Sequence, residues 1–209
     1  MMQPNHFRGL YAIVDDQAHA EFGIANLLQQ LVFNSPVTVI QLRLKTLSDS
    51  QKRAVIATAV EFKKHRAFTL ILNDDVRFLD TPGLDGLHLG QSDGDFATIR
   101  QAFPNSVLGL STHSLAEAQE AQALGADYIG CGCLFPTATK TDTQVLTWAE
   151  LQKITAAIHI PKVGIGGIHA GNMQQPIDAG CNMVAMISSL VAQKQFVGHT
   201  LHNALIHRA

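Results

Sequence analysis

Two cationic side chains alternate with leucines in one short apolar segment, in a pattern suited to holding an anion. Gln41, Arg43 and Lys45 alternate with Leu42 and Leu44, so in an extended strand the three polar side chains point to the same side. Two cations on one strand face repel each other unless negative charge lies between them. The spacing predicts an anion-binding site; the alternatives are a solvated strand end and ion pairs with neighbouring acids.

Carboxylates follow two other apolar runs. Asn73, Asp74 and Asp75 come directly after one run, and Asp93 lies shortly after the next. Two carboxylates at neighbouring strand ends raise each other's pKa unless a cation lies between them. Mg²⁺ prefers oxygen ligands, keeps several waters and takes the remaining ligands from substrate phosphates. Carboxylates at these two strand ends therefore suit a Mg²⁺ site; the alternative for Asp74 or Asp75 is a turn or helix cap.

Hydroxyl, imidazole and ammonium groups follow further runs. His88 alternates with Gly90 and is expected to point inward, either to a substrate or as a hydrogen-bonded core residue. Ser111 ends another run. Thr137, Thr139 and Lys140 lie close together and could hold phosphate oxygens; the alternative is an ordinary polar loop.

Small residues complete the set near the end of the chain. Gly166 and Gly167 follow one apolar run, and Ile187, Ser188 and Ser189 follow the last, where we expect them to open the final helix. Backbone amides and the positive end of a helix dipole bind phosphate at such positions. The residues thus predict two anion sites, one cationic and one formed by backbone groups.

Eight aliphatic runs must carry these residues. Their lengths are typical of buried parallel strands, and amphipathic stretches such as Glu21–Phe33, Gln51–Phe62 and Leu115–Leu124 separate several of them. The third interval is the shortest, so its helix should be short. The runs are Leu10–Val14, Val37–Leu42, Thr69–Leu72, Gly86–Leu89, Val107–Leu110, Asp127–Cys131, Lys162–Ile165 and Met183–Ile187.

Eight such units in one domain favour a (β/α)8 TIM barrel, whose working face lies at the carboxyl ends of the strands. A doubly wound open sheet is the alternative, disfavoured because no GxGxxG follows the first run. Three helix starts have capping-box spacing: Ser48 with Gln51, Ser114 with Glu117, and Thr147 with Glu150. We expect one domain over residues 1–209, with its core over about 9–206.

Composition excludes several classes of protein. Of the 209 residues 46% are hydrophobic and 15% charged, with a net charge of -2, which argues against disorder and against nucleic-acid binding. No window is long and apolar enough for a membrane span or a signal peptide, so we expect a cytoplasmic protein. Three cysteines are too few for a disulfide framework. Cys131 and Cys133 should share one strand face, without a metal-binding role.

The ordered motifs resemble those of the thiamine-phosphate synthase family along nearly the whole chain. They are Gly9–Asp15, Gln41–Lys45, Asn73–Asp74, Gly86–Asp93, Gly109–His113, Gly125–Gly130, Phe135–Lys140, Gly164–Ile168 and Ala185–Ser189.

This resemblance implies that hydroxymethylpyrimidine diphosphate and hydroxyethylthiazole phosphate are joined into thiamine monophosphate with release of pyrophosphate. The chemistry it implies is dissociative: pyrophosphate leaves, a pyrimidine methyl cation forms, and the thiazole nitrogen attacks it. It also implies a possible homodimer. By motif, Asp74 and Asp93 would bind Mg²⁺. The pyrimidine diphosphate would contact Gln41, Arg43, Lys45, Asn73, Ser111 and Lys140, of which Arg43, Lys45, Ser111 and Lys140 are catalytic candidates. The thiazole phosphate would contact Thr137, Thr139, Gly167, Ile187 and Ser188, and His88 is a further substrate-binding candidate.

Two departures from the family pattern stand out. Leu44 replaces a common acidic residue, which predicts the loss of an ion-pair partner for Lys45. Residues 144–147 replace a common Pro-x-Gly-Leu stretch, which predicts a different closure of the loop before them. Two alternative functions stay open. One is an isomerase like the thiazole tautomerases, whose residues differ from this chain at the metal and pyrophosphate positions, and the other is a non-catalytic binding module. Release of pyrophosphate would distinguish the synthase from both.

Overall fold

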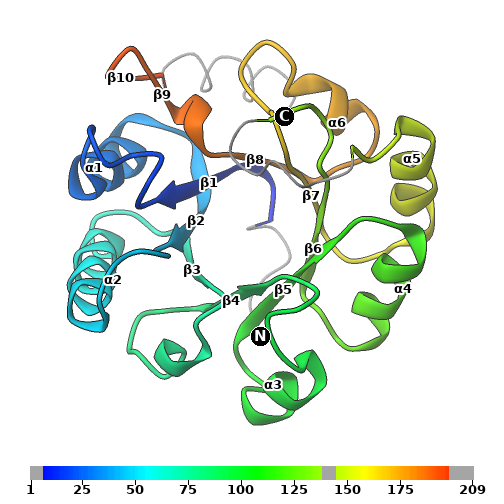
Figure 1. The fold of residues 1–209 in the computed structure, drawn as a ribbon, viewed down its shortest axis with the longest axis horizontal. Helices are drawn as coiled ribbons and strands as arrows, with labels where there is room; N and C mark the ends of the chain where they lie inside the picture. Colours follow the sequence, from blue (N-terminus) through cyan, green and yellow to red (C-terminus); the bar gives the residue numbers. More distant parts are fainter. Residues whose placement is uncertain (1–6, 138–144, 198–209) are drawn as a thin grey trace.

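The computed structural model is a closed barrel of eight parallel strands, and it describes residues 7–137 and 145–197. Strand β1 pairs with both β2 and β8, which closes the sheet. The strands lie at the centre of Figure 1 and the helices outside them. The predicted (β/α)8 barrel is confirmed. The strands are β1 (Gly9–Asp15), β2 (Val37–Arg43), β3 (Thr69–Asn73), β4 (Gly86–Leu89), β5 (Val107–Thr112), β6 (Tyr128–Cys131), β7 (Lys162–Gly164) and β8 (Met183–Met186).

Alternation along the strands divides the core into two layers. In β1, Leu10, Ala12 and Val14 pack outward in the larger cluster, between sheet and helices. Tyr11 and Ile13 point inward and belong to the smaller cluster inside the barrel. Because both faces of each strand are covered, the strands are largely apolar, and polar side chains such as Gln41 and His88 lie towards their carboxyl ends.

Aromatic rings fill the amino-terminal end of the barrel. Phe7, just before β1, stacks on Tyr128 with ring centroids 5.3 Å apart, and Tyr11 lies against the same ring at 5.8 Å. Gly109 makes room for this packing, since a Cβ there would overlap the Tyr128 ring. The barrel is therefore closed at this end, and a cavity has room only towards the carboxyl ends of the strands.

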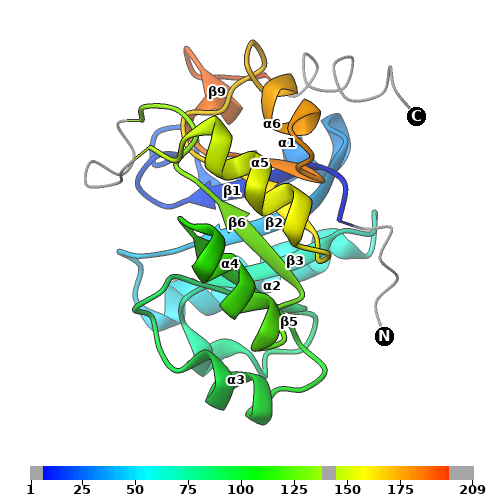
Figure 2. The same ribbon diagram turned by 90° about the vertical axis from the view of Figure 1, so that its right-hand side faces the viewer.

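Helices cover the sheet, as the side view in Figure 2 also shows. In the described ranges none of them is long and apolar enough to cross a membrane. Their bounds are α1 (Ile24–Asn34), α2 (Asp49–Lys63), the 3-10 turn η2 (Val76–Phe78), α3 (Phe96–Ala102), α4 (Leu115–Ala123), α5 (Trp148–Ala157), α6 (Gln174–Asp178) and the 3-10 turn η3 (Ser188–Leu190), followed by the strand pair β9 (Val191–Ala192) and β10 (Gln195–Phe196).

One predicted capping box is complete, and in the other two the acidic side chain accepts from an amide outside the box. Ser48 accepts the N–H of Gln51, whose side chain accepts the N–H of Ser48. Ser114 also caps its helix, but Glu117 accepts from the amide of the preceding residue, His113. The carboxylate of Glu150 instead accepts the N–H of the first residue of α4 at 3.0 Å. The acid side chains of α4 and α5 thus satisfy amides outside their own capping boxes.

The structure corrects several predicted elements. The short third crossover is confirmed, since it contains only the turn η2, but α1 begins at Ile24 rather than at Glu21 because residues 16–22 form turns. Ser188 opens the single turn η3, followed by a strand pair, instead of a full helix. Cys131 and Cys133 do not share a strand face, since β6 ends at Cys131. Cys131 packs outward, whereas Cys133 lines the cavity.

Candidate active site

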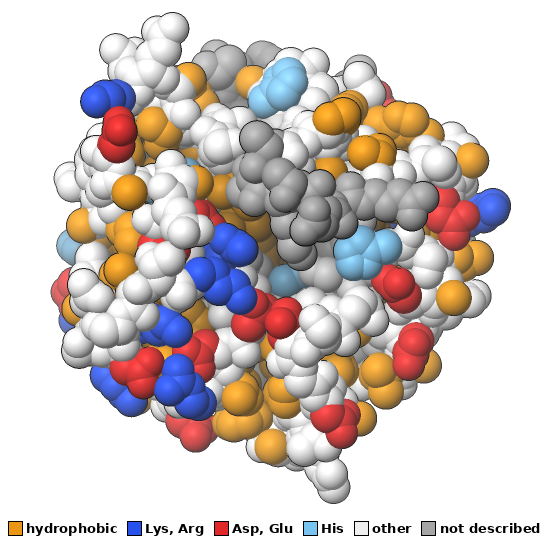
Figure 3. All heavy atoms as spheres, in the orientation of Figure 1, with side chains coloured by type: hydrophobic (Ala, Val, Ile, Leu, Met, Phe, Trp, Pro, Cys, Tyr) orange, Lys and Arg blue, Asp and Glu red, His pale blue; other side chains and the backbone are white. Residues whose placement is uncertain are grey.

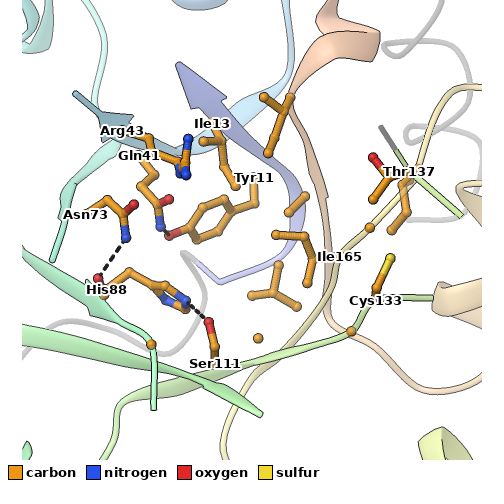
Figure 4. A pocket seen from close by; sticks show the side chains of 18 of the residues that line it. Tyr11, Ile13, Gln41, Arg43, Asn73, His88, Ser111, Cys133, Thr137 and Ile165 are labelled. Atoms are coloured by element: carbon orange, nitrogen blue, oxygen red, sulfur yellow. Dashed lines mark hydrogen bonds between the residues drawn. The ribbon is translucent and has the colours of Figure 1, made fainter. Parts of the chain in front are cut away.

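A cavity of about 870 Å³ opens at the carboxyl ends of the strands. In Figure 3 basic and acidic side chains meet beside the hollow at the centre of this face. Figure 4 shows Gln41, Asn73, His88 and Ser111 on one side of it and Thr137 on the other. All the described residues predicted to bind substrate or metal line this one cavity: Gln41, Arg43, Lys45, Asn73, Asp74, His88, Asp93, Ser111, Thr137, Gly167, Ile187 and Ser188. Thr139 and Lys140 lie outside the described residues.

A chain of hydrogen bonds crosses the floor of the cavity. Gln41 Nε2 donates to the Tyr11 hydroxyl at 2.7 Å, and the Tyr11 and Tyr128 hydroxyls lie 2.8 Å apart. The Tyr128 hydroxyl lies 3.0 Å from His88 Nδ1, and His88 Nε2 lies 2.9 Å from Ser111 Oγ (Figure 4). Five side chains from five strands are thereby linked.

The protonation of the two phenols gives this chain a direction. Burial raises the pKa of Tyr11 above its ordinary value, and burial also raises that of Tyr128, further increased by the nearby Tyr11. Each phenol therefore keeps one hydrogen to donate. The arrangement that uses each of these hydrogens has Gln41 donating to Tyr11, Tyr11 to Tyr128, Tyr128 to His88 Nδ1, and His88 Nε2 to Ser111, which requires the His88 tautomer with its hydrogen on Nε2. The chain then presents an amide oxygen at Gln41 and a hydroxyl donor at Ser111.

His88 contacts protein groups through both ring nitrogens and stacks on Tyr128 at 5.4 Å. This matches the alternative of a hydrogen-bonded core histidine, although the ring also lines the cavity. Its contact with substrate stays a prediction.

The two predicted cations each have a carboxylate partner. Arg43 Nη1 donates to Asp15, whose side chain is only 2% exposed, and Lys45 Nζ donates to Asp74. Lys45 thus has an ion-pair partner in Asp74, although position 44 holds a leucine that packs in the outer core. The ion-pair interpretation of this segment is confirmed. Both cations also line the cavity, and their binding of an anion stays a prediction.

Asp74 and Asp93 are neighbours, whereas Asp75 belongs to a different network. Burial raises the pKa of Asp74, Lys45 lowers it, and the adjacent Asp93 raises it again, leaving it above its ordinary value. Asn73 Nδ2 donates to Asp74 at 2.6 Å. Asp75 instead accepts from Lys52 at 2.7 Å, away from the cavity lining.

The donor set suits a hard divalent cation completed by substrate oxygens. Asp74 and Asp93 offer adjacent carboxylates, and burial together with Asp93 holds the pKa of Asp74 above its ordinary value despite the ion pair with Lys45. Within residues 7–137 and 145–197, no group of three or more His, Cys, Asp or Glu side chains could hold a metal ion by itself. The two carboxylates of Asp74 and Asp93 match the number expected for Mg²⁺, which is usually bound through one or two carboxylates together with phosphates and water.

Backbone segments after β7 and β8 form the other end of the cavity. Gly167 has a φ of +64°, and a Cβ there would lie 2.7 Å from the carbonyl oxygen of Pro136. Phe135, just before Pro136, packs edge-on against Trp148 of α5 with ring centroids 5.5 Å apart. The glycine segment therefore fits closely against the segment that carries Thr137.

Comparison with known proteins identifies the family of the chain. A family model described as thiamine monophosphate synthase matches residues 10–190. The chain belongs to this family. A thiamine-phosphate synthase of Ruminiclostridium cellulolyticum is 38% identical over 188 residues, covering 88% of each chain. One of Shouchella clausii is 35% identical over 190 residues, covering 88% of this chain and 89% of the relative.

A solved structure supports the same assignment. Thiamine phosphate pyrophosphorylase from Pyrococcus furiosus superposes with a TM-score of 0.85 at 27% identity, over 97% of this chain and 96% of that one. Family, relatives and fold agree, and the chain is an enzyme of thiamine biosynthesis with the activity of a thiamine-phosphate synthase.

Sequence reasoning missed the partners that hold the predicted residues. Tyr11 and Tyr128 link Gln41 to Ser111, and Asp15 pairs with Arg43. The signal for Tyr11 was present, since a phenol at an inward position of a strand needs a hydrogen-bond partner when buried. Tyr128 lies 117 residues further along the chain, and nothing in the local pattern links the two.

Proposed function

We propose that the cavity binds hydroxymethylpyrimidine diphosphate and hydroxyethylthiazole phosphate side by side and joins them with release of pyrophosphate. The observation that carries this proposal is a single cavity with two chemically different ends. One end has cationic side chains beside paired carboxylates, and the other has glycine and serine backbone segments. A diphosphate with a divalent cation suits the first end, and a phosphate monoester suits the second.

At the first end, Arg43 and Lys45 would offset charge on the departing pyrophosphate, with Lys140 as a further contact by family motif. Asp74 and Asp93 would hold Mg²⁺, which supplies additional positive charge when bound. The polar chain would orient the pyrimidine ring, because Gln41 offers an acceptor and Ser111 a donor. Fixed charges and dipoles of this kind need not reorganise during the reaction.

At the second end, the phosphate monoester would meet the backbone after β7 and β8, near Gly167 and Ser188. Thr137 faces the same cavity, and Thr139 is a further contact by motif. Holding the thiazole nitrogen close to the pyrimidine methylene gives the rate gain of an oriented bimolecular reaction. No side chain has to form a covalent bond in this scheme.

The experiment is a turnover assay with purified protein, both substrates and Mg²⁺, measuring pyrophosphate and thiamine monophosphate together. We expect equal amounts of the two products, and neither product when one substrate is left out. Excess chelator should abolish turnover. Pyrophosphate released without the thiazole substrate, or full activity in chelator, would contradict the proposal.

A cytoplasmic location and a homodimer also stay predictions. The family's small-molecule substrates and the absence of a membrane-spanning helix in the described parts of the chain support the first. Light scattering after size-exclusion chromatography tests the second, with twice the mass of the 22.6 kDa chain expected.

A further inference from the structure

A buried histidine outside the cavity lining holds one of its walls. His19 lies in the turns between β1 and α1, and it is only 1% exposed. Its Nε2 lies 3.1 Å from the carbonyl oxygen of Ile187, and its Nδ1 lies 3.0 Å from the amide nitrogen of Asp15. His19 thus joins the segment after β1 to the segment after β8, across 168 positions of sequence.

The partners of His19 fix its tautomer. A backbone N–H can only donate, so Nδ1 accepts from Asp15. The Asp15 carbonyl, 3.1 Å from Nδ1, also accepts the N–H of His19 itself. A neutral imidazole that accepts at Nδ1 carries its hydrogen on Nε2. His19 therefore donates to the carbonyl of Ile187, which can only accept.

This bond sets the direction of a backbone amide. The carbonyl of Ile187 and the N–H of Ser188 belong to one planar trans peptide, in which they point in opposite directions. His19 binds the carbonyl from behind the wall, whereas Ile187 and Ser188 both line the cavity. The N–H of Ser188 consequently faces away from His19, on the cavity side. Among the described residues, no acceptor is recorded for this N–H.

We propose that His19 is a positioning residue for the phosphate monoester of the second substrate: by holding the Ile187 carbonyl, it aims the amide N–H of Ser188 at the phosphate. This inference rests on the proposed placement of the thiazole phosphate at this end of the cavity. The chemistry recognised is a phosphate dianion, which accepts strong hydrogen bonds from backbone amides. His19 itself touches no substrate.

Two polar variants of similar size separate the contacts of His19. In His19→Gln the amide nitrogen takes the place of Nε2, so it can still donate to Ile187. In His19→Asn the side chain reaches only as far as Nδ1, so the contact with Asp15 is kept and that with Ile187 is lost. We expect His19→Asn to raise KM for hydroxyethylthiazole phosphate about three- to tenfold, the worth of one hydrogen bond. His19→Gln should stay within about twofold of wild type, as should the KM for the pyrimidine diphosphate in both variants.

A second comparison separates phosphate positioning from general support of the fold. Calorimetric titration with hydroxyethylthiazole phosphate and with the unphosphorylated thiazole alcohol should show a loss in His19→Asn for the phosphate ester alone. A structural role would weaken both ligands equally and would affect both variants, and that result overturns the proposal. The wild-type protein gives an independent test by amide NMR: the Ser188 N–H signal should shift when the phosphate ester is added, and an unmoved signal overturns the proposal without any variant.

Ser188→Ala distinguishes failure of this inference from failure of the proposed function. If Ser188→Ala raises KM for the thiazole phosphate while His19→Asn leaves it unchanged, the role of His19 is wrong and the binding site stands. If neither variant alters that KM, the role of His19 is wrong; the placement of the phosphate is wrong as well if the Ser188 N–H signal also stays unmoved, because Ser188→Ala keeps the backbone amide.

Discussion

Asp74 and Asp75 are adjacent carboxylates with opposite electrostatic situations, and exchanging each for Asn should separate activity from stability. Burial and the neighbouring Asp93 raise the pKa of Asp74, against the opposing effect of Lys45. Burial alone would also raise the pKa of Asp75, but hydrogen bonds and charges from Arg77 and Lys52 lower it below its ordinary value. Ionised Asp74 is therefore costly to the fold, and ionised Asp75 supports it.

The signs and sizes follow from these directions. A raised pKa in the folded state means that Asp74 destabilises the metal-free fold at pH 7 and that the penalty disappears as pH falls through that pKa. Asp74→Asn removes this penalty together with the ion pair to Lys45. Because the Lys45 side chain is 42% exposed, that ion pair is worth at most about 1 kcal/mol. The free energy of unfolding should therefore change by less than about 1 kcal/mol. Asp75→Asn loses stability that is present above the unfolded pKa, about 0.5 to 1.5 kcal/mol or roughly 1–6 °C in Tm.

The effects on activity should have the opposite order, with a large loss in Asp74→Asn and a small one in Asp75→Asn. Asp74→Asn should lower kcat about 100-fold, because a metal ligand beside the leaving pyrophosphate is lost, and Mg²⁺ should no longer raise its Tm in the presence of pyrophosphate. Asp75→Asn should keep kcat within about threefold, since Asp75 does not line the cavity. The assays are steady-state pyrophosphate release and thermal unfolding between pH 5 and 8. Equal loss of kcat in both variants, or a large loss of stability in Asp74→Asn with kcat intact, would refute the reasoning.

Three further changes test other parts of the cavity. Arg43→Ala should cost about 2–4 kcal/mol in kcat/KM and also lower Tm, because the Asp15 carboxylate is left buried without its cation. Adding Asp15→Asn to this variant should restore Tm but not kcat/KM. An unchanged Tm in Arg43→Ala would contradict the prediction. Tyr128→Phe should interrupt the chain at His88 and reduce kcat/KM for the pyrimidine diphosphate roughly tenfold, measured against an unchanged KM for the thiazole phosphate. Ser188→Ala should raise KM for the thiazole phosphate a few-fold; equal weakening of both substrates would argue against separate ends.

The barrel and its rim were predictable because their signals are local. Continuous aliphatic runs predict buried parallel strands, and the polar residues that follow each run must then meet at one face. Cations spaced two apart, as in Arg43 and Lys45, share a strand face in any extended conformation.

The side-chain partners were not predictable, because they depend on conformation and on distant residues. Asp74 adopts a φ of +60°, an uncommon conformation for a residue other than glycine, and this turn sends Asp74 and Asp75 to different neighbours. Small residues after the last strand suggested a helix, yet Ser188 opens only one 3-10 turn because a strand pair follows. A histidine such as His19 gives no sign in sequence of the carbonyl it will bind.

The close fit of Gly167 also limits how the second end can be tested. Because a Cβ at this position would meet Phe135 and Pro136, Gly167→Val would displace the segment that carries Thr137 as well as any phosphate. Ser188→Ala is therefore the cleaner variant.

The edge-on contact between Phe135 and Trp148 gives this enzyme an intrinsic optical probe. Trp148 is the single tryptophan of the 209 residues, so tryptophan emission from the whole protein originates at one ring, 38% exposed and packed on the segment beside Gly167. Unlabelled wild-type protein can therefore be mixed rapidly with each substrate while its fluorescence is recorded. Comparing the fluorescence change on mixing with each substrate alone, and with each substrate after the other has bound, then gives the order in which the two ends of the cavity fill.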